Sequence, residues 1–211
     1  MARIKNGIHG AFSGKIGKVV GYVSKGQGIM RTQGERTTPP TPKELLNRKK
    51  FATSQKWLSP LTDFLRIGFK DYQPTYEGFV AAKSYNHRNA LLCDEENNYY
   101  IDPALALVSY GNQPVPANAS AVYTPEKGVT FTWSKEGSYA HNDYAMVLLY
   151  NVDDEKAQYH PAIATRKTGT ASFSVADRFL GKTIHLYLAF TSDDQKQRSK
   201  SIYLGKLAIP A

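Results

Sequence analysis

Glycines, lysines and β-branched residues alternate near the start of the chain in a way that suggests contact with phosphate. The stretch Gly14-Lys15-Ile16-Gly17-Lys18 places two cations among glycines, and glycine-rich loops with a lysine can cradle phosphate groups. A P-loop needs four residues between its glycines and a Ser or Thr after the lysine, and neither feature is present. Gly14, Gly17 and Gly21 do not fit the dinucleotide fingerprint either. We therefore predict no nucleotide site and no cofactor.

The histidines, carboxylates and single cysteine lack the spacing of a metal or catalytic site. No two histidines are separated as in a zinc motif. The acidic runs at 153–155 and 193–194 lack the alternating oxygens, glycine and distal glutamate of a calcium loop, so we interpret them as solvated turns. Three acidic residues follow Cys93, which disfavours a reactive thiolate, and no Gly-x-Ser-x-Gly elbow occurs. The sequence thus predicts a protein that is not an enzyme, with no catalytic residue and no metal site.

Positive charge is concentrated in the first third of the chain. Residues 1–70 hold 14 Lys and Arg against three Asp and Glu, a net charge of +11, whereas residues 71–211 hold 13 against 15, a net charge of −2. This distribution suits a polyanion partner, or attraction between the basic part of one copy and the acidic part of another. The candidate polyanion-binding residues are Lys15, Lys18, Lys25, Arg48, Lys49 and Lys50.

The N-terminal segment is predicted to form a β arm. Residues 16–32 have the composition of a β-hairpin with a turn at 24–28. Glycine adds no side chain to a core, and an isolated hairpin is marginally stable in water. We therefore expect this arm to become ordered against a sheet, a second subunit or a polyanion. The candidate assembly residues are Phe12, Gly14, Lys15, Ile16, Gly17, Val19, Val20, Gly21, Tyr22, Ile29 and Arg31.

Helix signals follow the arm. Thr41, Pro42 and Glu44 form the pattern of a capping box with proline at the first helical position, and they predict a helix over residues 42–58. Further helices are expected at 60–67 and 78–91.

The C-terminal half has the strand pattern of a β-sandwich. Short strands are expected at 97–101 and 105–109, and then at 119–123, 129–133, 144–150, 162–167, 170–175, 183–190 and 199–207. Seven strands separated by turns indicate an antiparallel sandwich of the immunoglobulin or fibronectin III kind, and the absence of a cysteine pair favours the latter. The predicted fold is mainly β with a small helical part. The predicted division is an arm at 1–40, a helical region at 41–103 and a sandwich domain at 104–211.

Composition bears on the core, the disulfide content and the cellular location of the protein. Hydrophobic residues make up 41% of the chain, which is enough for a core. With one cysteine, no intramolecular disulfide can form. No apolar run suits a membrane span, and the N-terminus lacks a signal peptide pattern. The default location is cytoplasmic, and release outside the cell by a non-classical route is the alternative.

Several short motifs resemble an uncharacterised family of bacterial proteins about 210 residues long. The most specific is Phe-Ser-Gly-Lys-x-Gly at 12–17. The others lie at 6–8, 19–21, 40–41, 69, 89–90, 101–102, 109–111 and 201–205. The resemblance covers nearly the whole chain and implies no assigned activity.

Three functions follow as hypotheses. The first is a structural protein that self-associates through the arm into an oligomer, filament or tube. The second is non-specific nucleic-acid binding by the basic N-terminal third. The third is a surface adhesion or carbohydrate-binding module. We expect the protein itself to be the main partner and nucleic acid the alternative, with no small-molecule substrate.

Overall fold

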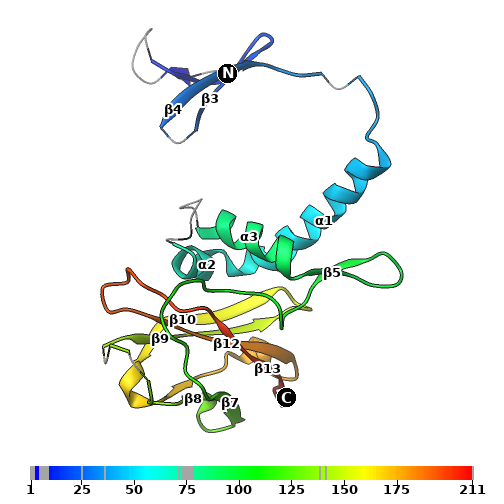
Figure 1. Ribbon diagram of the computed structural model, residues 1–211. Coiled ribbons are helices and arrows are strands. Elements are labelled where there is room, and N and C mark those ends of the chain that lie inside the picture. Colours follow the sequence, from blue (N-terminus) through cyan, green and yellow to red (C-terminus); the bar gives the residue numbers. More distant parts are fainter. Residues whose placement is uncertain are drawn as a thin grey trace. The chain divides into compact units, whose positions relative to one another are not determined.

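The chain is divided into two compact units, Met1–Glu44 and Leu45–Ala211. The computed structural model describes residues 3–4, 10–24, 26–35, 37–70, 72, 78–137, 139–140 and 142–210. Figure 1 shows both units and labels many of their elements. We call the first unit the arm and the second the body, and describe each by itself.

The arm contains a four-stranded antiparallel sheet. Its strands are β1 (Arg3–Ile4), β2 (Phe12–Ile16), β3 (Val19–Ser24) and β4 (Gln27–Thr32), in that spatial order. The predicted hairpin is confirmed as β3 and β4. Gly14 has a φ of 122°, a conformation that favours glycine. The residues before Gly14 in β2 pair with β1, and the rest of β2 pairs with β3.

The first predicted helix is confirmed as α1 (Pro42–Leu58). Its capping box is formed, because the Thr41 backbone N–H donates to Glu44 Oε2 at 2.8 Å and the Glu44 N–H donates to Thr41 Oγ1 at 3.3 Å. The next turn is a 3₁₀ segment, η2 (Ser59–Leu61), which leads into α2 (Thr62–Gly68).

The third helix, α3 (Gly78–Asn89), ends earlier than predicted. Leu91 instead begins β5 (Leu91–Cys93), which pairs with β6 (Tyr99–Ile101). The predicted strand at 105–109 is wrong. There, the backbone N–H of Val108 donates to the Ser201 hydroxyl, and Ser109 Oγ donates to Gly68 and Ser199 carbonyls. Side-chain hydrogen bonds thus replace a strand ladder.

Two antiparallel sheets face each other in the body. One contains β10 (Lys156–Thr165), β9 (Tyr144–Asn151), β12 (Thr183–Thr191) and β13 (Ile202–Ala208), in that order. The other contains β11 (Thr170–Phe173), β8 (Gly128–Trp133) and β7 (Ala119–Thr124). Two 3₁₀ segments, η3 (Arg166–Thr168) and η4 (Asp177–Phe179), lie between strands. The protein is mainly β with a small helical part, as predicted.

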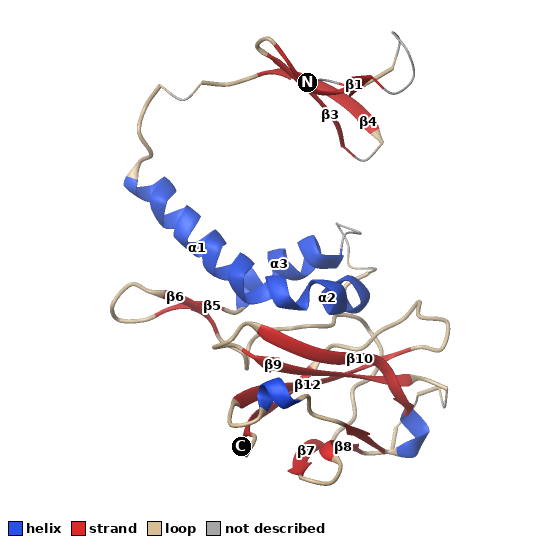
Figure 2. Ribbon diagram, turned by 180° about the vertical axis from the view of Figure 1, so that it is seen from behind, coloured by secondary structure: helices blue, strands red, loops and turns tan. Residues whose placement is uncertain are grey.

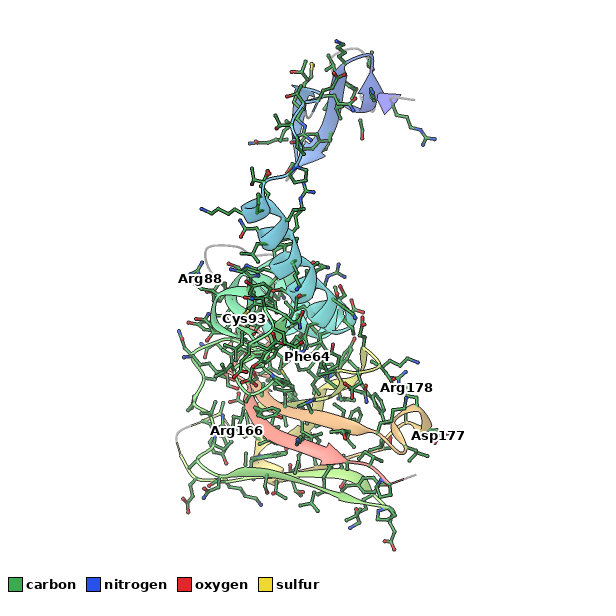
Figure 3. The ribbon with its side chains drawn as sticks, turned by 90° about the vertical axis from the view of Figure 1, so that its right-hand side faces the viewer. Phe64, Arg88, Cys93, Arg166, Asp177 and Arg178 are labelled. Carbon is green, nitrogen blue, oxygen red and sulfur yellow. The ribbon has the colours of Figure 1, made fainter. Side chains whose placement is uncertain are left out.

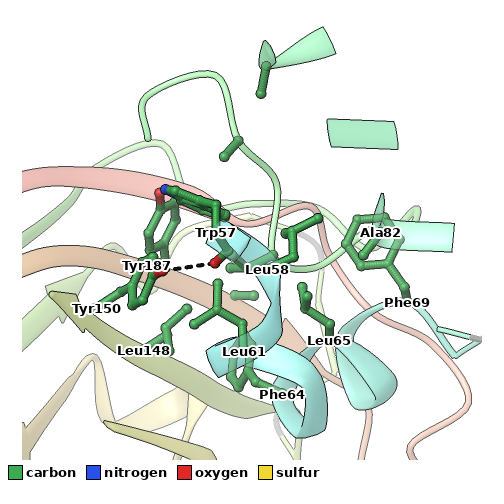
Figure 4. Close-up of a cluster of buried hydrophobic side chains, with 14 of the residues drawn as sticks. Trp57, Leu58, Leu61, Phe64, Leu65, Phe69, Ala82, Leu148, Tyr150 and Tyr187 are labelled. Atoms are coloured by element: carbon green, nitrogen blue, oxygen red, sulfur yellow. Dashed lines mark hydrogen bonds between the residues drawn. The ribbon is translucent and has the colours of Figure 1, made fainter. Parts of the chain in front are cut away.

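Strand β9 takes part in two hydrophobic cores. Met146, Leu148 and Tyr150 face the helices, and the residues between them face the three-stranded sheet. In the helix-side core, the Tyr150 hydroxyl donates to the Trp57 carbonyl at 2.8 Å, and the two rings meet edge-to-face at 5.1 Å (Figure 4). The helices therefore cover one face of the four-stranded sheet (Figure 2), and the helical region and the sandwich share this core.

One histidine makes the body sensitive to acid. His185 on β12 is partly buried, and its Nδ1 lies 2.8 Å from the Tyr203 hydroxyl. Burial lowers the pKa of His185 below its ordinary value of 6.5. The unfolded chain therefore takes up a proton at a higher pH than the folded protein does. Linkage then makes stability fall as the pH drops through about 6.5 toward the folded pKa.

We expect urea unfolding to give a lower free energy of unfolding at pH 5.5 than at pH 8. His185→Gln keeps a partner for Tyr203 but cannot titrate, so it should reduce this difference. The matched control is His160→Gln, on the exposed side of edge strand β10, which should leave the difference unchanged. An equal pH dependence in wild type and His185→Gln would contradict the assignment.

Candidate assembly surface on the arm

Most residues of the described arm are exposed to solvent, and the rest, with one exception, are half-buried. Among residues 10–24 and 26–35, the buried residue is Gly21, which has no side chain. A sheet is stabilised by burying one face against another layer. The described part of the arm therefore has no hydrophobic core of its own.

One face of the arm sheet is apolar and rich in glycine. Cross-strand partners share a face, and the pairs Gly14–Gly21, Ile16–Val19 and Gly21–Met30 define this one. Its large side chains are exposed: Ile16 by 52%, Val23 by 55% and Met30 by 67%. We call residues 14, 16, 19, 21, 23 and 30 the apolar face; Gly28 and Thr32 share this side of the sheet, and the Phe12 ring covers it at Gly21. Exposed apolar clusters of this kind mark interaction sites.

The opposite face carries the cations. Lys15 pairs with Val20, and Val20 pairs with Arg31, so the three lie in a row across β2, β3 and β4. The Arg31 guanidinium lies 5.7 Å from the centre of the Tyr22 ring, which pairs with Ile29. We call residues 15, 20, 22, 29 and 31 the cationic face.

Close packing within the arm depends on Gly21. A Cβ at this position would lie 2.6 Å from the Phe12 ring and 2.5 Å from the Phe12 carbonyl oxygen. Phe12 is half-buried, and its ring therefore covers the backbone of β3. Gly17 and Lys18 form the turn between β2 and β3. The structure thus brings the predicted assembly residues together in one sheet but divides them between two faces.

The predicted polyanion-binding residues of the helix have partners within the body. Lys49 Nζ donates to the Asn97 carbonyl at 3.0 Å and to Asn98 Oδ1 at 3.2 Å. Lys50 Nζ lies 5.1 Å from the centre of the Tyr99 ring. These two lysines hold the β5–β6 hairpin against α1, while Arg48 on the same helix is exposed. Lys25 lies outside the described residues.

Val23 and Met30 belong to the apolar face but were absent from the predicted set. Their alternation with Gly21 and Gly28 was the signal that would have identified them. In the described part of the chain, no cluster of three or more His, Cys, Asp or Glu side chains has the arrangement of a metal site. Nor is any helix among these residues both long and apolar enough to cross a bilayer.

Comparison with known proteins identifies the family to which the chain belongs. Searches of curated proteins and of solved structures gave no match to this sequence. A family of unknown function, DUF6266, matches residues 11–205. The matched region runs from just before β2 into β13, so it includes most of the arm and nearly all of the body. The resemblance expected from the sequence motifs is confirmed: the chain belongs to the DUF6266 family.

Proposed function

We propose that this protein is a non-enzymatic structural protein that self-associates through its arm into an oligomer, filament or tube. The observation that carries the proposal is the exposed apolar face on a sheet whose described residues form no hydrophobic core of their own. Covering Ile16, Val23 and Met30 would contribute about 1 kcal/mol each. The surface of a second copy of the protein can bury these side chains.

The free edge of the arm sheet supports the same function. Among the described residues, β4 pairs with β3 along one side only. An unpaired edge offers backbone donors and acceptors to an incoming strand. Strand addition and burial of the apolar face would therefore act together.

We infer that β7 in the body of a second copy is the acceptor strand. β7 ends the three-stranded sheet, pairs with β8 through six consecutive residues without a bulge, and exposes Val122. The other long edges are less regular. β10 contains Pro161 and a register shift, and β13 contains a register shift near Gly205, which are features that discourage edge pairing. An arm-to-body contact joins two different surfaces, so it propagates into a filament unless it closes into a ring.

We also propose that the sandwich is of the fibronectin III kind. The support is the division of the sandwich into one sheet of three antiparallel strands and one of four. Along the chain, β7 and β8 lie in the first sheet, β9 and β10 in the second, β11 in the first, and β12 and β13 in the second. Such a scaffold suits a structural or adhesive module, and this part of the proposal is an argument from fold.

The test replaces the apolar face in the full-length chain. Ile16→Thr, Val23→Thr and Met30→Thr together keep the strand propensity but remove the apolar surface. We expect light scattering and negative-stain images to show large regular assemblies of wild type and single protomers of the triple variant. The matched control is Leu105→Thr, Val115→Thr and Leu180→Thr, three exposed apolar residues of the body, which should assemble as wild type does.

Two results would contradict self-association through the arm. One is a wild-type protein that stays a single protomer at high concentration. The other is a triple variant that assembles as well as the control.

Nucleic-acid binding is the second candidate function. The row of Lys15 and Arg31 on the cationic face, beside Tyr22, favours it, because cations contact phosphate and aromatic rings stack on bases. Nuclease treatment of the assemblies separates the two functions. Assemblies held by protein contacts remain intact, whereas assemblies built on nucleic acid disperse.

A further inference from the structure

A pocket of about 970 Å³ lies at one end of the sandwich, wholly within the body. Its walls come from three segments: residues 110–114 before β7, then Tyr139, Ala140 and Asp143 between β8 and β9, and five residues within 192–198 between β12 and β13. Tyr72 completes the rim. Loops gathered at one end of a rigid sandwich are a common place for ligand binding.

Three charged side chains are buried at or beside this pocket. Asp143 and Arg198 line it, and Arg166 lies behind them, each with at most 3% of its surface exposed. The Arg166 guanidinium is held between the rings of Tyr139 and Phe190, 4.4 Å from each centre (Figure 3 labels Arg166). Charged groups are rarely this buried unless they are held in a defined arrangement.

Hydrogen bonds join the three walls. Arg166 Nη1 donates to the Pro114 carbonyl at 2.7 Å, and the Arg166 backbone N–H donates to the Asp143 carbonyl at 2.6 Å. The Gln113 backbone N–H donates to the Arg198 carbonyl at 2.9 Å. The pocket is therefore formed before any ligand arrives, as ligand sites usually are.

The polar groups of the lining suit a ligand with many hydroxyls. Gln113 Oε1 is buried and has no hydrogen-bond partner among the described residues, and an unsatisfied buried acceptor is costly. The exposed amides of Asn112 and Gln197 and the Ser192 hydroxyl also line the pocket. Amides and hydroxyls both donate and accept hydrogen bonds, and each sugar hydroxyl does the same.

Tyrosine rings supply the apolar part of the site. Tyr72 and Tyr110 meet edge-to-face at 4.8 Å, and Lys200 Nζ lies 5.5 Å from the centre of the Tyr110 ring. Tyr139 closes the rim on the opposite loop. Tyrosine combines a flat apolar face with a polar hydroxyl. Its ring can therefore pack against the C–H face of a sugar ring, and its hydroxyl can form hydrogen bonds with the sugar hydroxyls.

The four charged side chains that line the pocket sum to zero, so they give no net attraction to a phosphate or other polyanion. Two carboxylates, Asp143 and Asp194, balance two cations, Lys196 and Arg198. Hydrogen bonds from Ser192 and Lys196 lower the pKa of Asp194, which therefore stays ionised at neutral pH and repels an anion. An uncharged polyhydroxyl ligand meets no such repulsion.

We propose that this pocket binds a neutral carbohydrate, a short chain of hexose or N-acetylhexosamine units. The tyrosine rim packs against the sugar rings, and the side chains of Asn112, Gln113 and Gln197 bond to their hydroxyls. This binding site is distinct from the apolar face, because every residue that lines it belongs to the body, and none of these residues belongs to β7.

The test uses the full-length protein and an array of neutral, sialylated and phosphorylated oligosaccharides. We expect binding to neutral members, followed up by calorimetric titration of the best-bound free oligosaccharide. Asn112→Ala combined with Gln197→Ala should weaken this binding at least tenfold. Both side chains are exposed, so circular dichroism should show an unchanged fold.

The matched control is Glu126→Ala combined with Lys127→Ala. These exposed residues form the β7–β8 turn, at the other end of β8 from the β8–β9 loop, and the control should bind as wild type does. The proposal is overturned if no neutral oligosaccharide binds, if only charged members bind, or if the Asn112/Gln197 variant binds as tightly as the control. The triple variant of the apolar face should retain binding, so a failure of self-association leaves this test valid.

Discussion

Replacing Leu58 with alanine should lower the free energy of unfolding of the body by about 2–5 kcal/mol. Leu58 is fully buried near the end of α1, in the core shared by the helices and the four-stranded sheet (Figure 4). Its loss leaves a cavity between two packed layers that cannot collapse freely. Urea unfolding followed by circular dichroism measures the change.

Leu45→Ala is the matched control, since Leu45 lies on the same helix with 51% of its surface exposed. Its effect should stay within about 0.5 kcal/mol, because alanine is a good helix former and little packing is lost. Equal effects at the two positions would show that the helix does not share a core with the sheet.

The same experiment reports whether the body unfolds as a single unit. The two tryptophans lie in different cores, Trp57 on the helix side of the four-stranded sheet and Trp133 in the sandwich. Because β9 contributes to both cores, we expect fluorescence and circular dichroism to follow one transition. Separate transitions would indicate that the two cores are independent.

Replacing Gly21 with leucine should abolish self-association. The new side chain would meet the Phe12 ring at 2.6 Å and the Phe12 carbonyl at 2.5 Å, so either β2 or β3 must shift. The change would disturb both faces of the arm sheet at once. Light scattering of the full-length variant measures the outcome, and the unfolding of the body should stay as in wild type.

Gly34→Leu is the control for this change, because no heavy atom lies within 4 Å of the position that its Cβ would take. This variant should assemble like wild type. If Gly21→Leu also assembles like wild type, the arm sheet described here is not the element that joins the copies.

Local signals predicted much of the fold. Thr41 and Glu44 identified the start of α1 because a capping box acts within four residues. The short strands of the sandwich were recognisable from their regular recurrence and from the turn residues between them. The sequence did not show that Leu58 and Tyr150 belong to one core, because they are far apart along the chain and meet only through tertiary packing.

The sites were less predictable than the elements. The arm residues were found from composition, yet their division between an apolar and a cationic face depends on strand register, as the row of Lys15, Val20 and Arg31 shows. Residues 105–109 are apolar enough for a strand, but two hydrogen bonds hold them in a loop: the Val108 backbone N–H donates to the Ser201 hydroxyl, and the Ser109 hydroxyl donates to the Ser199 carbonyl. The pocket beside Asp143 combines three loops that no local pattern links.

The burial of β9 on both sides has a consequence for how the family can diverge. The even-numbered side chains from 146 to 150 pack against the helices. The odd-numbered side chains from 145 to 149 pack against the three-stranded sheet. A volume change at Leu148 must be compensated among the helices, whereas one at Leu149 must be compensated across the sandwich. The two halves of the body can therefore accumulate substitutions independently while inheriting the same central backbone.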